Sequence, residues 1–393
     1  MNLQRDPNIN EFLDTVCAQV KCREVHSALK TELLNHMEDR IEDLTGKGIP
    51  IKEAIPQAIK DMGDPVSIGI QLAHTHRPKI HWRLIIVTLL FLGFGLFTLY
   101  TIQANHLLRH EIQVFYKSAF YALLGAMLLI LVSRLDYRKL WPLSPYIYLI
   151  TLVIWLYALI SGPTVAGLPY LLIGPWAINL GAVTPYFLIA ASAGLLLKCD
   201  WNDRKSYLIS GALFIIPLML YLASSCLSGL LLFGGAFLVL VWRSGGKKLH
   251  ISLLMALLLI PAVLKIIAQP YRLERITGFL NPQADPGGAG YLYLQLDQAI
   301  RSAGLLGHGF NLSALPELHT DFVFAYIVYS FGWLAAMLLL MLVLGFFIYL
   351  FGTVKQANHE YGSLLIAGLA TLLLIQSLWH IFMNLGWLPV TGM

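Results

Sequence analysis

Long apolar segments alternate with short polar connections along most of the chain, whereas the first eighty residues are polar. A helix needs about 20 apolar residues to cross the hydrocarbon core of a bilayer. The pattern therefore predicts an all-α, polytopic membrane protein with about nine transmembrane helices. The predicted segments lie at roughly 84–103, 115–133, 145–161, 184–197, 206–223, 226–242, 249–268, 322–351 and 362–384.

The polar first part of the chain also has a helical repeat. Apolar residues recur three to four positions apart between residues 8 and 76. This spacing predicts three or four short amphipathic helices, which form a small bundle within residues 1–80. Its glutamates and lysines fit a solvated face, with docking to a partner protein as the alternative. The repeat comprises Phe12, Val16, Val20, Leu29, Leu33, Met37 and Ile41.

Composition supports a membrane protein and excludes a soluble enzyme. Hydrophobic residues make up 57% of the chain and charged residues 12%, with a mean hydropathy of +0.68. Ordinary soluble proteins carry about 25% charged residues. Residues 1–80 hold 12 acids and 10 bases, a balance of −2, and the remainder holds 10 acids and 17 bases, a balance of +7. The net charge of +5 therefore sums two unlike parts and does not indicate a nucleic-acid partner.

Lysine and arginine gather in alternate connections. Nine of them follow the second, fourth and sixth apolar segments, whereas the connections at 104–114 and 162–183 hold only Arg109. Basic residues in short loops mark the cytoplasmic side of a membrane. We therefore expect these connections and the N-terminal bundle to be cytoplasmic. The nine residues are Arg134, Arg138, Lys139, Lys198, Arg204, Lys205, Arg243, Lys247 and Lys248.

The longest connection runs from about Gln269 to Thr320, on the predicted outer side. It is too long for a simple link between two helices. Long ordered loops on a rigid scaffold often carry functional sites, so we expect the chemistry here. With the re-entry point at Asp321, this stretch contains half of the ten acids outside the polar head, namely Glu274, Asp285, Asp297, Glu317 and Asp321.

An ordered series of short motifs begins in this connection. Its elements are Arg275, Phe279, Pro282, Asp285 with Pro286, Gly290 with Tyr291, Gln295, Gly307, Gly309, Leu315–Phe322 and Asn384–Gly392. The series resembles the SEDS family (shape, elongation, division and sporulation; the FtsW, RodA and SpoVE proteins). These are membrane proteins of about ten helices that polymerise peptidoglycan from lipid II, so the resemblance implies a protein of the bacterial plasma membrane.

The resemblance implies that Asp321 is the essential acidic residue. Extending a glycan from a lipid-linked donor needs a base that takes the proton of the acceptor hydroxyl. Asp321 lies at the outer end of an apolar segment, where partial desolvation would raise the pKa of its carboxyl group. We predict that it is the general base or, alternatively, the ligand of a divalent cation. The structural alternative is that it caps the helix beginning at Phe322.

Further residues are predicted to bind the substrate. Arg272 and Arg275 lie three positions apart, and guanidinium groups suit a diphosphate, with lipid headgroups as the alternative ligand. For Lys265, the alternative to substrate binding is that its ammonium group extends to the membrane surface. For Glu317 and His319, the alternative is that they order their loop. The predicted substrate-binding residues are Arg272, Arg275, Lys265, Glu317, His319 and Gln295.

The sequence departs from the family at several polar positions. Leu180–Ala182 replace a Pro-Ser-Glu motif, Pro185 stands where a lysine would be, and Ser225 replaces an aspartate. Tyr329–Gly332 replace Glu-Glu-Leu-Gly. At least three carboxylates and one cation of the family's polar interior are thus missing, and we expect one membrane helix fewer than the family has. Residues 1–80 are an addition that resembles the helical domain preceding some permease-like membrane proteins.

Three functions are compatible with this pattern. The leading hypothesis is a peptidoglycan glycosyltransferase that polymerises lipid II on the outer face, in elongation, division or sporulation. Its implied partner is a class B penicillin-binding protein. The missing carboxylates favour a non-catalytic scaffold or regulator of cell-wall or spore assembly instead. The third hypothesis, a lipid II transporter, would need a polar path through the bundle.

Overall fold

The computed structural model describes residues 6–20, 26–75, 82–107, 113–165, 168–174, 176–312, 315–357 and 359–391. Contacts between residues divide the chain into two units, Met1–Trp82 and Arg83–Met393. Each unit contains a hydrophobic core of its own.

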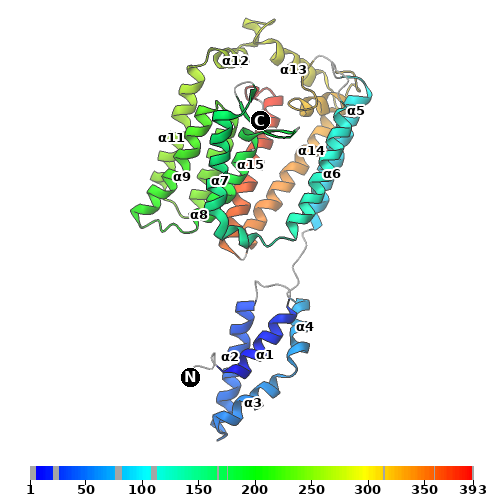
Figure 1. Cartoon of the computed structure of the whole chain (residues 1–393). Helices are drawn as coiled ribbons and strands as arrows, with labels where there is room; N and C mark the ends of the chain where they lie inside the picture. The colour runs from blue at the N-terminus through cyan, green and yellow to red at the C-terminus, as the bar shows by residue number, and fades with distance from the viewer. Residues whose placement is uncertain are drawn as a thin grey trace. The chain divides into compact units, whose positions relative to one another are not determined.

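The first unit is a bundle of four short helices (Figure 1). All seven positions of the predicted apolar repeat are buried. Asp6 caps the first helix, because its carboxylate accepts a 2.9 Å hydrogen bond from the backbone N–H of Asn8. Gly63, with φ of +92°, ends the third helix in a conformation that favours glycine. The helices are α1 (Pro7–Gln19), α2 (His26–Gly46), α3 (Ile51–Met62) and α4 (Pro65–Thr75).

Each of the nine apolar segments predicted from the sequence forms a helix in the second unit. Seven of these helices are long and apolar enough to cross a membrane, and α8 and α10 are apolar helices of 17 residues. The chain is thus a multi-pass, helical membrane protein. The nine helices are α5 (Trp82–Ala104), α6 (Val114–Ser133), α7 (Leu140–Ser161), α8 (Leu180–Leu196), α9 (Arg204–Ala223), α10 (Leu227–Arg243), α11 (Lys248–Ile267), α14 (Val323–Gln356) and α15 (Glu360–Asn384).

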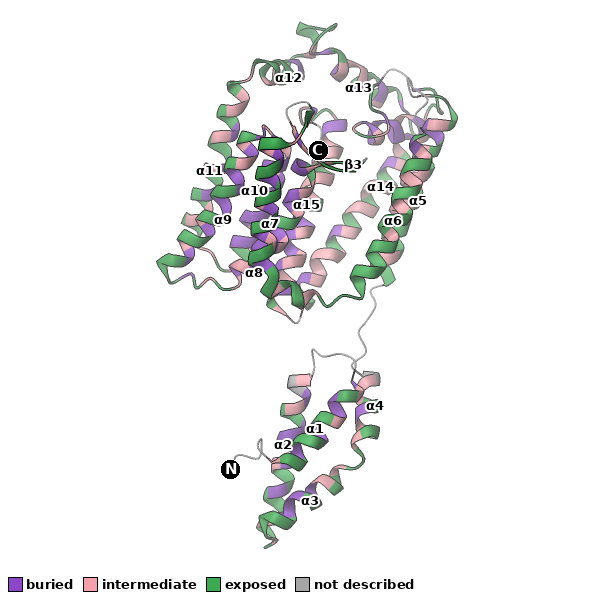
Figure 2. Ribbon diagram, viewed as in Figure 1, coloured by how far each residue is buried: buried purple, intermediate pink, exposed green. Residues whose placement is uncertain are grey.

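Apolar side chains cover the outside of this unit. On α6, Leu123 is 72% exposed and Met127 is 61% exposed, and most of the helix is exposed in Figure 2. Apolar surfaces of this extent are unfavourable in water and suit contact with lipid. Apart from its first and last turns, the backbone groups of such a helix are paired within the helix, as hydrocarbon requires.

The core of the second unit lies between α7, α8, α9, α10 and α15. The rings of Trp155 and Tyr221 meet edge to face, with centroids 4.2 Å apart. The hydroxyl groups of Tyr221 and Thr184 are hydrogen-bonded at 3.0 Å, and the hydroxyl of Tyr148 donates to the carbonyl oxygen of Leu213 at 2.9 Å. These bonds satisfy polar groups that hydrocarbon would otherwise leave unpaired.

The connections lie at two ends of the helical unit. The long-loop end carries the segment at 269–320, and the basic end carries the connections at 134–139, 198–205 and 243–248. In Figure 1, the long-loop end is marked by α12 (Pro270–Leu280) and α13 (Tyr291–Ser302). Asp321 and the C-terminus of α15 lie at this end.

A small antiparallel sheet, which the sequence pattern did not predict, connects α7 to α8. It consists of β1 (Thr164–Val165), β2 (Leu168–Ile173) and β3 (Trp176–Asn179), in the order β1-β2-β3. In its hairpin, Tyr170 pairs with Asn179 and Ile173 with Trp176. The strands lack a regular alternation of apolar and polar residues, so the pattern predicted a connection at 162–183 and no sheet within it.

Helix α14 is broken at Gly332. The backbone of this residue has φ of 84° and ψ of 171°, a conformation available essentially to glycine alone. A Cβ atom on Gly332 would lie 2.2 Å from the carbonyl oxygen of Leu305. A Cβ atom on Gly307, whose φ is +83°, would lie 2.4 Å from the carbonyl oxygen of Ser330. The two backbones therefore approach each other closely enough to exclude any side chain.

The loop at 304–308 pairs with the backbone groups around this break. Its hydrogen bonds replace helical bonds that a broken membrane helix leaves open. Gly307 and Gly309 have φ of +83° and +85°, a backbone conformation that favours glycine. The three bonds are Trp333 N to Gly304 O at 3.1 Å, Leu334 N to Leu305 O at 3.1 Å and His308 N to Tyr329 O at 2.9 Å.

Candidate functional site

The long segment folds into α12, the short helix η4 (Pro282–Ala284) and α13 before it reaches Asp321. The carboxylate of Asp285 accepts hydrogen bonds from the N–H groups of Gly288 and Ala289, at 3.1 and 2.9 Å. A Cβ atom on Gly290 would lie 2.0 Å from the carbonyl oxygen of Pro282. These motif residues therefore build the turn between α12 and α13.

Asn384 holds the backbone of Asp321 in place. It is fully buried at the end of α15, and its Oδ1 accepts a 2.9 Å hydrogen bond from the N–H of Ala325. Its Nδ2 donates to the carbonyl oxygens of Asp321 and His380, at 2.9 and 2.8 Å. One side chain therefore caps the start of α14 and joins Asp321 to α15.

The alternative that Asp321 caps α14 is wrong. The helix begins at Val323, and its N-cap residue is Phe322, whose side chain forms no capping hydrogen bond. The carboxylate of Asp321 accepts no hydrogen bond from the residues that the structure describes. It is therefore available to a ligand.

Replacing Asn384 by alanine is expected to destabilise the protein by about 2 kcal/mol, because a buried N–H and a carbonyl group would lose their partner. Thermal unfolding in detergent measures the change. Asn202→Ala is the matched control, since Asn202 is exposed in a connection at the basic end. An Asn384→Ala protein that melts like the wild type would contradict the capping role.

A turn beside Asp321 is ordered by Glu317 and His319. Glu317 has φ of +50°, and its carbonyl oxygen accepts from the N–H groups of Thr320 and Phe322 at 3.1 and 3.3 Å. Its Oε2 accepts from Thr320 Oγ1 at 3.2 Å and lies 3.8 Å from Nε2 of His319. Both residues therefore shape the loop, and their contact with substrate stays a prediction.

The surroundings of Asp321 favour its protonated form. Burial is the largest cause and raises the pKa of its carboxyl group, and the negative charge of Glu317 adds to the increase. His380, Arg275 and His319 oppose it in that order. A carboxyl group with a raised pKa is a better proton acceptor once ionised, which suits a general base.

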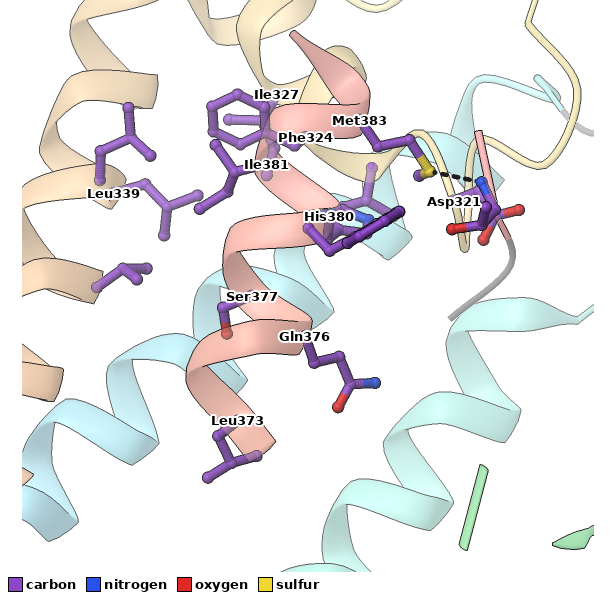
Figure 3. Close-up of a pocket in the computed structure, with 15 residues that line it drawn as sticks. Asp321, Phe324, Ile327, Leu339, Leu373, Gln376, Ser377, His380, Ile381 and Met383 are labelled. Carbon is purple, nitrogen blue, oxygen red and sulfur yellow. Dashed lines mark hydrogen bonds between the residues drawn. The ribbon is translucent and has the colours of Figure 1, made fainter. Parts of the chain in front are cut away.

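An apolar cavity of about 350 Å³ lies between α14 and α15, and Asp321 lines it. Figure 3 shows Asp321 beside His380 and Met383, with Gln376 and Leu373 further along α15. Residues on both sides of the break in α14 contribute to the wall. The cavity thus offers one carboxylate and an extended apolar surface, a combination that suits a ligand with a polar group and a hydrocarbon chain.

The two predicted arginines differ in their surroundings. Arg272 is half-buried, and its Nη2 donates to the backbone carbonyl of Ser225 at 2.7 Å while its Nε donates to the hydroxyl of Tyr271 at 2.7 Å. Arg275 is exposed, and its side chain forms no hydrogen bond or ion pair with the described residues. Of the two, Arg275 is the one that acts electrostatically on Asp321.

Lys265 and Gln295 lie elsewhere on the long-loop end. Lys265 is half-buried in the last turn of α11, and Gln295 is half-buried on α13. Neither side chain is hydrogen-bonded to a described residue, and neither contributes to the electrostatics of Asp321. The structure thus gathers Asp321, Glu317, His319 and Arg275 and leaves these two apart.

Two residues of the site were not among the residues predicted to bind substrate or to catalyse the reaction. His380 donates from Nε2 to the carbonyl oxygen of Thr320 at 3.3 Å, and Asn384 follows it by one helical turn. The i, i+4 spacing of polar residues in an otherwise apolar segment was the signal that could have found them.

Asp321 is alternatively the predicted ligand of a divalent cation. The described residues include no group of three or more His, Cys, Asp or Glu side chains that could hold a metal ion. A cation at Asp321 would therefore need water and substrate phosphates as its other ligands, which is a common arrangement for Mg²⁺.

Fold and site together define a polytopic membrane protein with a carboxylate at an apolar cavity between two membrane helices. The family described as "Cell cycle protein" (FtsW, RodA, SpoVE) matches residues 81–393, and this chain belongs to that family. The resemblance predicted from the motifs is thereby confirmed.

Curated relatives agree with this assignment. The chain is 29% identical over 334 residues to the probable peptidoglycan glycosyltransferase FtsW of Coxiella burnetii, covering 79% of this chain and 88% of the relative. It is 25% identical over 326 residues to stage V sporulation protein E of Bacillus subtilis, with the same coverage.

The fold is similar to two solved structures. The first comes from a study of how a peptidoglycan synthase complex coordinates polymerization and crosslinking. Its TM-score is 0.67 and its sequence identity 24%, and the match covers 79% of this chain and 89% of that chain. The second is RodA of Thermus thermophilus, with a TM-score of 0.59 and 21% identity over 79% and 87%.

Proposed function

We propose that this protein is a cell-wall glycosyltransferase that polymerises lipid II, with Asp321 as the general base. The observation that carries the proposal is the free carboxylate, with a raised pKa, at the end of an apolar cavity between two membrane helices. Membership of the family and the names of the curated relatives support the reaction class. The basic end would be cytoplasmic and the long-loop end external, where the lipid-linked substrate is displayed.

The proposed step transfers a glycan from a lipid pyrophosphate to a hydroxyl group. Asp321 takes the proton as the acceptor oxygen attacks the anomeric carbon. The bond between this carbon and the pyrophosphate oxygen breaks, and the lipid pyrophosphate leaves with the electron pair. Arg275 would stabilise this leaving charge, because its guanidinium group is exposed and unpaired among the described residues. The apolar cavity would hold part of the lipid chain.

A class B penicillin-binding transpeptidase is the proposed partner. The similarity of the fold to a protein studied in a peptidoglycan synthase complex supports this choice. The test is the purified full chain, alone and with a candidate partner, incubated with labelled lipid II, with the glycan length read on a gel. Polymer formation is expected. Its absence with every partner would contradict the proposed function.

A non-catalytic scaffold is the second candidate function. The buried polar residues of the described chain are serine, threonine and asparagine, without a charged residue among them. This agrees with the loss of the family's interior carboxylates, such as the aspartate replaced by Ser225. The same observation disfavours a lipid II transporter, which would need polar groups along its path. Polymerisation by the wild-type protein would exclude the scaffold.

Replacing Arg275 by alanine is expected to move the acidic limb of the pH–activity profile to higher pH. The positive charge of Arg275 lowers the pKa of Asp321, so its removal allows the pKa to rise further. Because only the ionised carboxylate accepts the proton, more alkaline conditions would be needed. Arg301→Ala is the control, since Arg301 is paired with Asp297 at 2.7 Å on the exposed face of α13. An unshifted profile would rule out this role.

A further inference from the structure

A second cavity, of about 510 Å³, lies at the basic end of the second unit. It is enclosed by the C-terminal ends of α8, α10 and α14 and by the N-terminal end of α15. Asp321 lies at the opposite ends of α14 and α15, so this cavity is separate from the site described above. Its polar lining consists of Arg243, Ser244, Lys355, Glu360 and Ser363.

Two basic side chains from different helices face this cavity. Arg243 donates from Nη2 to the hydroxyl oxygen of Ser363 at 3.1 Å, and that hydroxyl donates to the carbonyl of Val354 at 3.2 Å. Neither Arg243 nor Lys355 forms an ion pair with a residue that the structure describes. Glu360 is the one acidic lining residue, and it lies in the first turn of α15, where the helix dipole stabilises it. The lining therefore carries a net charge of +1.

An exposed tryptophan beside this cavity indicates its position relative to the membrane surface. Trp242 precedes Arg243 at the end of α10 and is 65% exposed, a placement typical of tryptophan at the boundary between hydrocarbon and water. Leu197 and Leu364 line the same cavity as the two cations. A ligand here would thus meet positive charge and apolar surface together.

We propose that this cavity binds the headgroup of an anionic phospholipid. Arg243 and Lys355 would contact the phosphodiester, Ser363 would add a hydroxyl group, and Leu197 and Leu364 would pack against the upper part of the acyl chains. Basic pockets between membrane helices recognise such headgroups. A free phosphate is also an anion, but it has no hydrocarbon that could pack against the apolar wall.

The test measures lipid binding to the full chain in detergent by native mass spectrometry. Phosphatidylglycerol, phosphatidylcholine and inorganic phosphate are titrated separately. We expect one phosphatidylglycerol to bind in preference to the other two. The double variant Arg243→Gln/Lys355→Gln is expected to bind phosphatidylglycerol about 30-fold more weakly, because it loses two cationic contacts to the headgroup.

The control is Arg204→Gln with Lys248→Gln, which removes two charges from the same end of the unit but outside the cavity lining. It is expected to keep the affinity of the wild type. The proposal is overturned if both double variants lose affinity equally, or if neither does. Equal binding of phosphatidylcholine would also overturn it, and equal binding of inorganic phosphate would assign the cavity to a free anion. Glutamine keeps the length of both side chains, and the melting temperature checks that each variant folds.

Discussion

Glycan polymerisation should be abolished when Asp321 is replaced by asparagine, while the protein still folds. Loss of a general base costs about 10²- to 10⁴-fold in rate. Asparagine has nearly the same shape, and the carboxylate of Asp321 accepts no hydrogen bond from the described residues, so the backbone bond to Asn384 is expected to persist. Polymer formation from labelled lipid II measures the effect.

The matched control for this variant is Asp297→Asn. Asp297 belongs to the same long segment, is exposed and pairs with Arg301 on its own helix. Its replacement removes one negative charge without touching the cavity, and near wild-type activity is expected. An Asp321→Asn protein that polymerises as fast as this control would eliminate Asp321 as the base.

Asp321→Asn is also expected to maintain or increase the stability of the folded protein at neutral pH. Burial raises the pKa of Asp321 in the folded state above its value in the unfolded chain. The folded state therefore holds its proton more tightly, and the wild type loses stability as pH rises from the unfolded to the folded pKa. Asparagine does not titrate, so the variant should melt at the same or a higher temperature at neutral pH. A variant that loses stability there would contradict this assignment of the pKa.

Replacing Gly332 by alanine is expected to destabilise the fold by about 3 kcal/mol or more, the upper range for backbone strain of this kind. Alanine does not readily adopt φ of 84° with ψ of 171°, and its Cβ would lie 2.2 Å from the carbonyl oxygen of Leu305. Since that neighbour is backbone, the loop at 304–308 must move away. Thermal unfolding in detergent and the yield of folded protein measure the loss.

Gly345 provides the matched control on the same helix. A Cβ atom there would meet no atom within 4 Å, and its backbone φ is not positive, so Gly345→Ala should leave stability unchanged or slightly higher. Gly307→Ala is an independent variant on the other side of the contact, where the Cβ would lie 2.4 Å from the carbonyl oxygen of Ser330. Equal melting temperatures for Gly332→Ala and Gly345→Ala would contradict the prediction that the contact between the break in α14 and the loop at 304–308 stabilises the fold.

The membrane helices and the family could be predicted from the sequence because each depends on order along the chain. A lipid-facing helix must be apolar over its whole length, so a single run of residues identifies it. The motif block around Asp321 is equally local. The helix α8 shows the limit of this reasoning, because its first residues, from Leu180, lie before the predicted start of the segment.

The sequence by itself determined the nine apolar helices, the apolar repeat of the N-terminal bundle and the acid around which the proposed site is built. Only the tertiary structure decided that Asn384 caps α14 across 59 residues, and that Arg272 reaches the carbonyl of Ser225 across 47. It also decided that Gly307 packs on the break at Gly332. Each of these depends on which backbone groups remain unpaired after the helices pack. Burial leaves such groups in need of partners, and no pattern along the chain states which distant side chain or loop will supply them.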